Sequence, residues 1–290
     1  MNRTVLVTGA KGQLGSELQK LSSRYSELNL FFTDREELDI SDRSRLEAFC
    51  TKNKIEIIIN CAAYTAVDKA EEDFDNADKI NHLAVQYLGE ISNAHNISLI
   101  HISTDYVFDG ESHKPYVEED PVAPQGVYGK TKLLGEQALL RINPKNSIII
   151  RTSWVYSSFG NNFVKTMLRL GEERDELGVI FDQVGTPTYA GDLAEAILEL
   201  LPKINNENVE IFHYSNEGVC SWYDFAKTIF ELSNTTCKVN PIETKEYPTP
   251  ATRPHYSLLN KAKIKNSFNL EVPYWKNSLQ VCLNVLKEDI

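Results

Sequence analysis

The sequence contains no apolar run long enough to cross a bilayer, because no uninterrupted stretch approaches the roughly 18 residues that a membrane-spanning helix needs. Its start, Met-Asn-Arg-Thr-Val, also lacks the apolar core of a signal peptide. The five cysteines are odd in number, widely spaced and without a Cys-x-x-Cys pair, which favours reduced thiols over a disulfide frame or a zinc site. They are Cys50, Cys61, Cys220, Cys237 and Cys282. We therefore expect a cytoplasmic protein that is not held in a membrane.

Positive charge is in short supply. The chain has 30 lysines and arginines against 41 aspartates and glutamates, which gives a formal charge of −11. Such a surface argues against bulk attraction to nucleic acid or anionic lipid, although it leaves room for a local basic pocket that holds a small anion. The six histidines show no spacing that is typical of metal ligands.

The remaining composition is that of a globular protein: 42% of the 290 residues are hydrophobic and 24% are charged. Short β-branched runs alternate with helical apolar spacing, and the alternation predicts an α/β fold with a doubly wound parallel Rossmann sheet. The expected strands are 3–8, 28–33, 55–60, 98–103 and 147–151, and the expected helices are 14–21, 44–50, 75–95 and 129–141.

Prolines interrupt the pattern beyond Thr152, which predicts a second, smaller mixed α/β lobe for the substrate over 152–290. Residues 1–151 are then the dinucleotide-binding domain. A strand at 179–181 and a helix at 192–201 still fit the first sheet, so we expect 177–201 to be interleaved with that domain.

A glycine-rich turn links the first predicted strand to the first helix, with the spacing Gly-x-x-Gly-x-x-Gly. The first glycine permits a tight turn, the second lets the backbone approach a pyrophosphate, and the third lets the helix pack closely on the sheet. The helix N-terminus then offers free N–H groups to the anion. We expect the turn to contact a dinucleotide through Gly9, Lys11, Gly12, Gln13, Leu14 and Gly15.

The end of the second predicted strand carries a carboxylate, Asp34, about 20 residues beyond the glycine turn, where it would bind the adenosine ribose. Asp34 would repel the 2′-phosphate of NADPH, whereas its neighbour Arg35 would pair with it, so both coenzymes stay open with a lean to NADH. Asp39 and Ile40 follow and are expected to flank the adenine ring.

Tyr128 and Lys132 lie four residues apart at the start of a predicted helix, so they share one face. An ammonium beside a phenol favours the phenolate and is expected to lower the pKa of Tyr128 towards the working range. Thr104 follows the fourth predicted strand, at the edge where open α/β sheets bind ligands. Hydroxyl, phenol and ammonium together predict a site for carbonyl reduction by a nicotinamide coenzyme.

These motifs resemble the extended short-chain dehydrogenase/reductase superfamily and, within it, the dTDP-4-dehydrorhamnose reductase family. The similarity covers essentially the whole chain and rests on several segments rather than one. They are the glycine turn, Asn60-Cys-Ala-Ala-Tyr-Thr-Ala-Val-Asp68, Ser103-Thr-Asp-Tyr-Val-Phe-Asp-Gly110, Tyr128-x-x-x-Lys132, Arg151-Thr-Ser-Trp-Val-Tyr156, Asp182-Gln-Val-Gly-Thr-Pro-Thr188 and Arg253-Pro-x-x-Ser-x-x-Asn260.

The resemblance implies NADH- or NADPH-dependent reduction of the C4 ketone of dTDP-4-dehydro-6-deoxy-L-mannose to dTDP-L-rhamnose. It implies that Tyr128 donates the proton, that Lys132 holds the nicotinamide ribose and that Thr104 binds the carbonyl oxygen. The implied coenzyme contacts are Ala62, Ala63 and Tyr64, and the implied sugar-nucleotide contacts are Thr65, Asp105, Tyr106 and Trp154. For the substrate pyrophosphate we expect Arg253, with Lys165 and Arg169 behind it.

Some members of the family bind Mg²⁺ through glutamates at a homodimer interface. Glu17 would correspond to one of them, but Asp192 and the Glu288-Asp289 end depart from that pattern. A homodimer and a bound Mg²⁺ therefore stay open, and the metal is not favoured.

Two other readings stay open. The regulatory subunit of methionine adenosyltransferase, a non-catalytic binding protein, resembles these reductases and shares many of their motifs. A sugar-nucleotide epimerase or dehydratase of the same superfamily is the other alternative. A dehydratase adds acidic residues beside its catalytic threonine, and here Asp105 is followed by Tyr106, which favours simple reduction.

Overall fold

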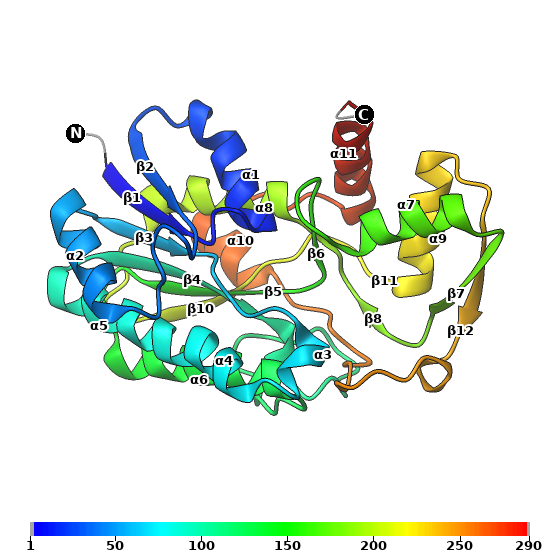
Figure 1. Cartoon of the computed structure of the whole chain (residues 1–290), viewed down its shortest axis with the longest axis horizontal. Helices are drawn as coiled ribbons and strands as arrows, with labels where there is room; N and C mark the ends of the chain where they lie inside the picture. Colours follow the sequence, from blue (N-terminus) through cyan, green and yellow to red (C-terminus); the bar gives the residue numbers. More distant parts are fainter. Residues whose placement is uncertain (1–2, 289–290) are drawn as a thin grey trace.

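The structure is a computed structural model that describes residues 3–288. Its centre is a six-stranded parallel sheet in the order β10-β5-β4-β3-β1-β2 (Figure 1). The strands are β1 (Arg3–Thr8), β2 (Leu28–Thr33), β3 (Ile57–Asn60), β4 (Ser98–Thr104), β5 (Ile148–Thr152) and β10 (Glu210–His213). The predicted fold class is confirmed. The sequence did not reveal β10, which is only four residues long and follows the less regular part of the chain.

Alternate side chains of the sheet enter two separate apolar cores, and each core is closed by helices. Val5, Val7 and Ile59 face one core with α1 (Gln13–Leu21), α8 (Ala190–Leu200) and α10 (Ala262–Phe268). Leu6 and Ile58 face the other with α2 (Arg43–Asn53), α5 (Ala84–His95) and α6 (Val127–Ile142). Burial on both faces explains why these strands read as continuous apolar runs.

The strand order reverses at β1, which lies between β2 and β3. Connections leave this point towards opposite faces of the sheet, so a crevice opens beyond the carboxyl ends of β1 and β3. Open α/β sheets bind their ligands at such a switch point. The topology therefore places the glycine turn, which follows β1, at the expected binding edge.

A second lobe lies on the right of Figure 1 and is built around its own apolar core. It contains the parallel pair β7 (Glu176–Ile180) and β12 (Lys238–Ile242), with α7 (Phe163–Glu173), α9 (Trp222–Ser233) and α11 (Trp275–Glu288). Four two-residue strands connect the lobes: β6 (Val155–Tyr156), β8 (Val184–Gly185), β9 (Thr188–Tyr189) and β11 (Cys220–Ser221).

The strand expected near 179–181 is β7, and it does not join the central sheet, because it pairs with β12. Its side chains alternate between buried and exposed, as in a strand with one covered face, whereas the central strands are covered on both. The helix expected at 192–201 is α8, and it does cover the central sheet.

Short helices complete the chain: η1 (Ser22–Arg24), α3 (Val67–Ala70), α4 (Phe74–Asp78), η2 (Lys79–Leu83), η3 (Asp105–Val107), η4 (Leu201–Lys203) and η5 (Thr244–Glu246). The helix expected over 75–95 thus consists of α4, η2 and α5, and η2 is a π-helical turn. None of the helices within 3–288 combines the length and apolarity needed to span a membrane.

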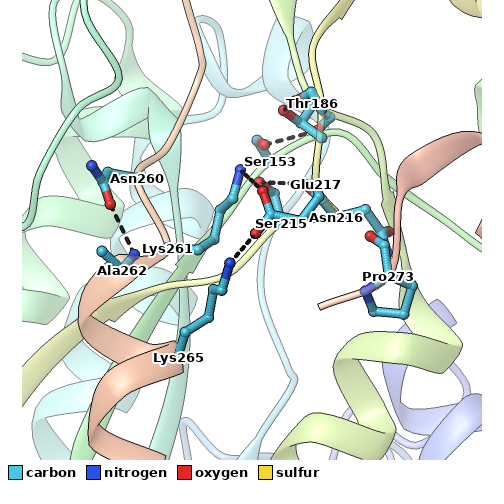
Figure 2. Close-up of polar contacts among 11 residues, drawn as sticks. Ser153, Thr186, Ser215, Asn216, Glu217, Asn260, Lys261, Ala262, Lys265 and Pro273 are labelled. Carbon is cyan, nitrogen blue, oxygen red and sulfur yellow. Dashed lines mark hydrogen bonds and ion pairs between the residues drawn. The ribbon is translucent and has the colours of Figure 1, made fainter. Parts of the chain in front are cut away.

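Glu217 lies in the connection between β10 and β11 and links this connection to α10 through ion pairs (Figure 2). Lys265 donates to its carboxylate at 2.6 Å, and Lys261, itself buried, lies 3.6 Å from the same group. The Glu217 backbone N–H also donates to the Pro273 carbonyl at 2.8 Å, just before α11. These contacts fix the second lobe against the helices that cover the sheet.

Candidate active site at the carboxyl edge of the sheet

A cavity of about 750 Å³ lies at the predicted edge of the sheet. The segments that follow β1, β2, β3 and β4 line it, together with the start of α6. The segment from Thr152 to Asn161, which leads into the second lobe, closes the other side. In the sequence, this side of the cavity was indicated by the motif Arg151-Thr-Ser-Trp154. Three further lining residues were not predicted from the sequence: Asn76, Lys79 and Ile80.

The glycine turn has the geometry that a bound pyrophosphate needs. Gly9 has φ +67°, and a Cβ there would lie 2.7 Å from the Ala62 backbone nitrogen. A Cβ on Gly15 would lie 2.3 Å from the Gly9 carbonyl oxygen, so only glycine lets α1 approach the turn. Gly12 caps α1 without a side-chain hydrogen bond, which leaves the N–H groups of the first turn for an anion. These residues fit a dinucleotide.

Asp34 lines the cavity at the end of β2. Its two carboxylate oxygens accept hydrogen bonds from the backbone N–H groups of Lys11, at 2.9 Å, and Arg35, at 2.7 Å. Asp39 and Ile40 also line the cavity, and Ser41 holds the Asp39 carboxylate with both its N–H and its hydroxyl. The residues expected around the adenosine are therefore brought together.

The residues expected at the coenzyme that line the cavity are Gly9, Gly12, Gln13, Leu14, Asp34, Asp39, Ile40, Ala62, Ala63, Tyr128 and Lys132. Lys11, Gly15 and Tyr64 are not among the lining residues. Lys11 extends to Glu36, Gly15 lies under the turn, and the Tyr64 hydroxyl donates to Asp73 at 3.0 Å.

The π-helical turn η2 positions the segment after β3. Asn81, within η2 and fully buried, accepts from the Tyr64 N–H at 2.8 Å and donates to the Tyr64 carbonyl at 3.1 Å. Its amide also donates to Thr131 on α6, and α6 approaches so closely that a Cβ on Gly135 would lie 2.2 Å from the Asn81 carbonyl. One amide thus joins the loop after β3 to the helix that carries Tyr128.

Tyr128 and Thr104 meet inside the cavity. Burial raises the pKa of Tyr128 to about 12, although a hydrogen bond with Thr104 acts in the opposite direction. The net shift of this pKa is therefore upward and not downward as expected, because desolvation of the phenolate dominates, and Lys132 is not among the groups that shift it. Thr104 accepts from the Tyr106 N–H and donates to the Asp105 carboxylate at 3.0 Å.

Lys132 lies at the end of a buried polar chain that the sequence did not reveal. Thr8 donates to Asn60 at 2.6 Å, the Asn60 amide lies 3.0 Å from Nδ1 of His101, and Nε2 of His101 lies 3.4 Å from the Lys132 ammonium. Lys132 also donates to the Ile102 carbonyl at 2.6 Å. Burial lowers its pKa to about 8, and burial likewise keeps the pKa of His101 well below its usual value.

Asp105 adds a buried carboxyl to the site. Burial raises its pKa to about 6, while the hydrogen bond from Thr104 and the nearby Ser257 hydroxyl act in the opposite direction. The neighbouring hydroxyl of Ser103 is buried and lacks a hydrogen-bond partner within the described chain. These groups can bind the hydroxyl groups of a polar ligand.

Trp154 presents its ring to the cavity from the junction of the lobes. It stacks on Trp222 with ring centroids 3.6 Å apart, and a Cβ on Gly185 would lie 2.9 Å from its indole. Its φ of +49° is unusual for a bulky residue and is held by this packing. Thr65 and Tyr106 also line the cavity, so the five residues expected there besides Arg253 are brought together.

Arg253 does not line the cavity. Its guanidinium donates to Asp68, on α3, at 2.6 Å, and the Ala251 N–H donates to the other Asp68 oxygen. Lys165 and Arg169 lie on α7 and are also absent from the lining, and Arg169 pairs with Glu173 on its own helix.

Two of the carboxylates considered for a metal are engaged elsewhere. Glu17 is buried and accepts from Ser157 at 2.6 Å, and Asp192 accepts from Asn216 and Ser278. Asp289 lies outside the described residues. Over 3–288 there is no cluster of three or more His, Cys, Asp or Glu that could hold a metal ion.

The family described as RmlD substrate binding domain matches residues 3–288. A dTDP-4-dehydrorhamnose reductase of Aggregatibacter actinomycetemcomitans is 45% identical and covers 95% of this chain and 97% of its own. The Escherichia coli K12 enzyme of the same name is 40% identical, with 97% of each chain covered.

Solved structures agree with these sequence relatives. A dTDP-4-dehydrorhamnose reductase from Clostridium acetobutylicum superposes with a TM-score of 0.92 and 44% identity over 98% of this chain and 99% of its own. A dTDP-4-dehydrorhamnose reductase from Bacillus anthracis, in complex with NADP, superposes with a TM-score of 0.93. It is 39% identical, over 98% of this chain and 100% of its own.

Proposed function

This chain belongs to the RmlD substrate-binding-domain family, and from that premise we propose that it is a dTDP-4-dehydrorhamnose reductase. It uses NADH or NADPH to reduce the C4 ketone of dTDP-4-dehydro-6-deoxy-L-mannose to dTDP-L-rhamnose. The relatives' names and their coverage of nearly the full chain support the reaction. The five unpaired cysteine thiols support the proposal that it works in the reducing cytoplasm.

The bound nicotinamide supplies the hydride that adds to the carbonyl carbon. Tyr128 donates its phenolic proton to the carbonyl oxygen, so that the C=O double bond becomes a C–O single bond with a new C–H and a new O–H bond. A pKa of about 12 suits this task, because the phenol is then fully protonated at neutral pH. The alkoxide that develops on the substrate is a stronger base than the phenolate, so the transfer remains favourable.

Thr104 holds the reacting oxygen beside Tyr128. Because its own hydrogen is donated to Asp105 in the present arrangement, the hydroxyl must rotate to donate to a carbonyl oxygen. Asp105 and Tyr106 then face the sugar ring, and Trp154 covers it from the junction of the lobes.

Lys132 binds the nicotinamide ribose and holds it against Tyr128. Its ammonium is buried and cannot donate freely to bulk water. Hydrogen bonds to the ribose hydroxyls therefore satisfy donors that would be costly to leave without a partner. Once Tyr128 has lost its proton, the Lys132 charge stabilises the phenolate until a new proton arrives.

The single observation that carries this proposal is the position of Tyr128. Its half-buried phenol shares one cavity with Thr104 and with the glycine turn at Gly9 and Gly12, whose geometry suits a pyrophosphate. Turnover separates this proposal from a non-catalytic binding protein that carries the same residues.

The test is Tyr128→Phe, assayed by the loss of reduced coenzyme with the dTDP-4-keto sugar. We expect turnover to fall by about 10²- to 10⁴-fold while coenzyme binding is retained. Tyr223→Phe, on α9 and outside the cavity, removes the same hydroxyl and should keep full turnover. The proposal fails if the wild-type protein consumes neither coenzyme, or if Tyr128→Phe turns over as the control does.

A further inference from the structure

The charges around Asp34 bear on the choice between the two coenzymes, and this inference rests on the proposed function. NADPH differs from NADH by one phosphate on the 2′-oxygen of the adenosine ribose. Asp34 is expected to bind this ribose. Both Asp34 oxygens are held by backbone N–H groups, one from Lys11 and one from Arg35. The backbone atoms that carry two cationic side chains, Lys11 and Arg35, therefore lie beside the expected position of that phosphate.

The two cations are not equally free. The Lys11 ammonium donates to Glu36 at 2.8 Å and lies 3.7 Å from Glu37, and Lys11 is not among the residues that line the cavity. Arg35 does line the cavity, with its side chain 77% exposed and 3.7 Å from Asp39. The carboxylate of Glu36 thus holds one of the two cations away from the ligand.

We propose that Glu36 sets the coenzyme preference by competing with the 2′-phosphate of NADPH for Lys11, beside the Arg35 side chain that is expected to pair with that phosphate. A phosphate monoester carries close to two negative charges at neutral pH. To reach Lys11 it must displace Glu36, whose freed carboxylate then repels it. NADH makes no such demand, so Glu36 opposes NADPH selectively.

The experiment measures dissociation constants for NADPH and NADH by coenzyme fluorescence, without sugar, for wild type, Glu36→Gln, Lys11→Met and the double variant. Glu36→Gln should tighten NADPH binding by about two- to fivefold, the range expected for an exposed ion pair, and leave NADH unchanged. Lys11→Met should weaken NADPH binding by at least as much. In that background Glu36→Gln should give a smaller gain than in wild type, because only the repulsion between Glu36 and the phosphate is left to remove. The gain should shrink as salt is raised.

The matched control is Glu172→Gln, which removes the same charge from an exposed position on α7 in the second lobe. It should change neither constant. The inference is overturned if Glu36→Gln affects NADH and NADPH equally, if the control gives the same gain, or if Lys11→Met leaves NADPH affinity intact.

The same titrations separate this inference from the proposed function. If wild-type protein binds neither coenzyme, both are refuted. If the NADPH constants shift as expected but no sugar is reduced, the inference stands and only the proposed reaction is refuted.

Discussion

The buried ion pair between Arg151 on β5 and Glu136 on α6 predicts a large loss of stability when one partner is removed. Their side chains are 3% and 1% exposed, and the guanidinium donates to both carboxylate oxygens, with Nε at 3.0 Å and the terminal nitrogen at 2.7 Å. Arg151→Met fills much of the same space but leaves Glu136 charged, buried and without its partner.

Breaking such a pair costs about 3–5 kcal/mol, against a total stability of about 5–15 kcal/mol for a typical protein. The control is Arg169→Met, which removes the same charge from a pair on α7 with side chains 60% and 52% exposed. That pair is worth only about 0.3–0.5 kcal/mol, so the two variants should differ roughly tenfold in their effect.

Urea unfolding of the coenzyme-free protein, followed by far-ultraviolet circular dichroism, measures both losses. The double variant Arg151→Met/Glu136→Met removes the unpaired charge and should recover a large part of the loss. If Arg151→Met costs less than about 1 kcal/mol, or if the double variant is as unstable as the single one, the reasoning from a stranded buried charge is refuted.

Three further results are expected. Gly15→Ala places a methyl group 2.3 Å from the Gly9 carbonyl oxygen, so it should destabilise the protein by about 1–3 kcal/mol and weaken coenzyme binding, as thermal melts and titrations would reveal. Because burial raises the pKa of Asp105 to about 6, the folded state binds more protons than the unfolded state between about pH 4 and 6, and stability falls as pH rises through that window. Asp105→Asn should therefore gain up to about 3 kcal/mol over wild type near pH 7 and nothing below about pH 4, as unfolding midpoints at the two pH values would measure. Coenzyme affinity should fall as pH rises through about 8, where Lys132 loses its charge, and a direct titration from about pH 6.5 to 9.5 tests this.

Local patterns predicted much of the fold. Strands β1 to β5 are apolar on both faces and are separated by helical spacing, so their type and order could be predicted without a structure. The glycine turn and the Tyr128–Lys132 pair depend on neighbours within a few residues, and the structure brings both to one cavity.

The remaining features depend on contacts between distant segments. Nothing near β7 in the sequence indicates that its partner is β12 rather than a strand of the central sheet. The buried chain from Thr8 through His101 to Lys132 unites four separate elements, and no spacing predicts it. The direction of the Tyr128 pKa shift also could not be predicted from local spacing, because desolvation depends on all the groups that pack around the ring.

The late entry of β10 into the sheet has a consequence for synthesis of the chain. Strand β5 ends at Thr152, and its neighbour begins only at Glu210, after part of the second lobe has been made (Figure 1). At about 5–20 residues per second the ribosome needs roughly 3 to 12 s for that interval, and meanwhile the three isoleucines of β5 form an open sheet edge. A nascent chain that stalls in this window, or a fragment cut there, exposes the unpaired N–H and C=O groups of β5, with which strands of other chains can pair. We expect chaperones to bind such a chain.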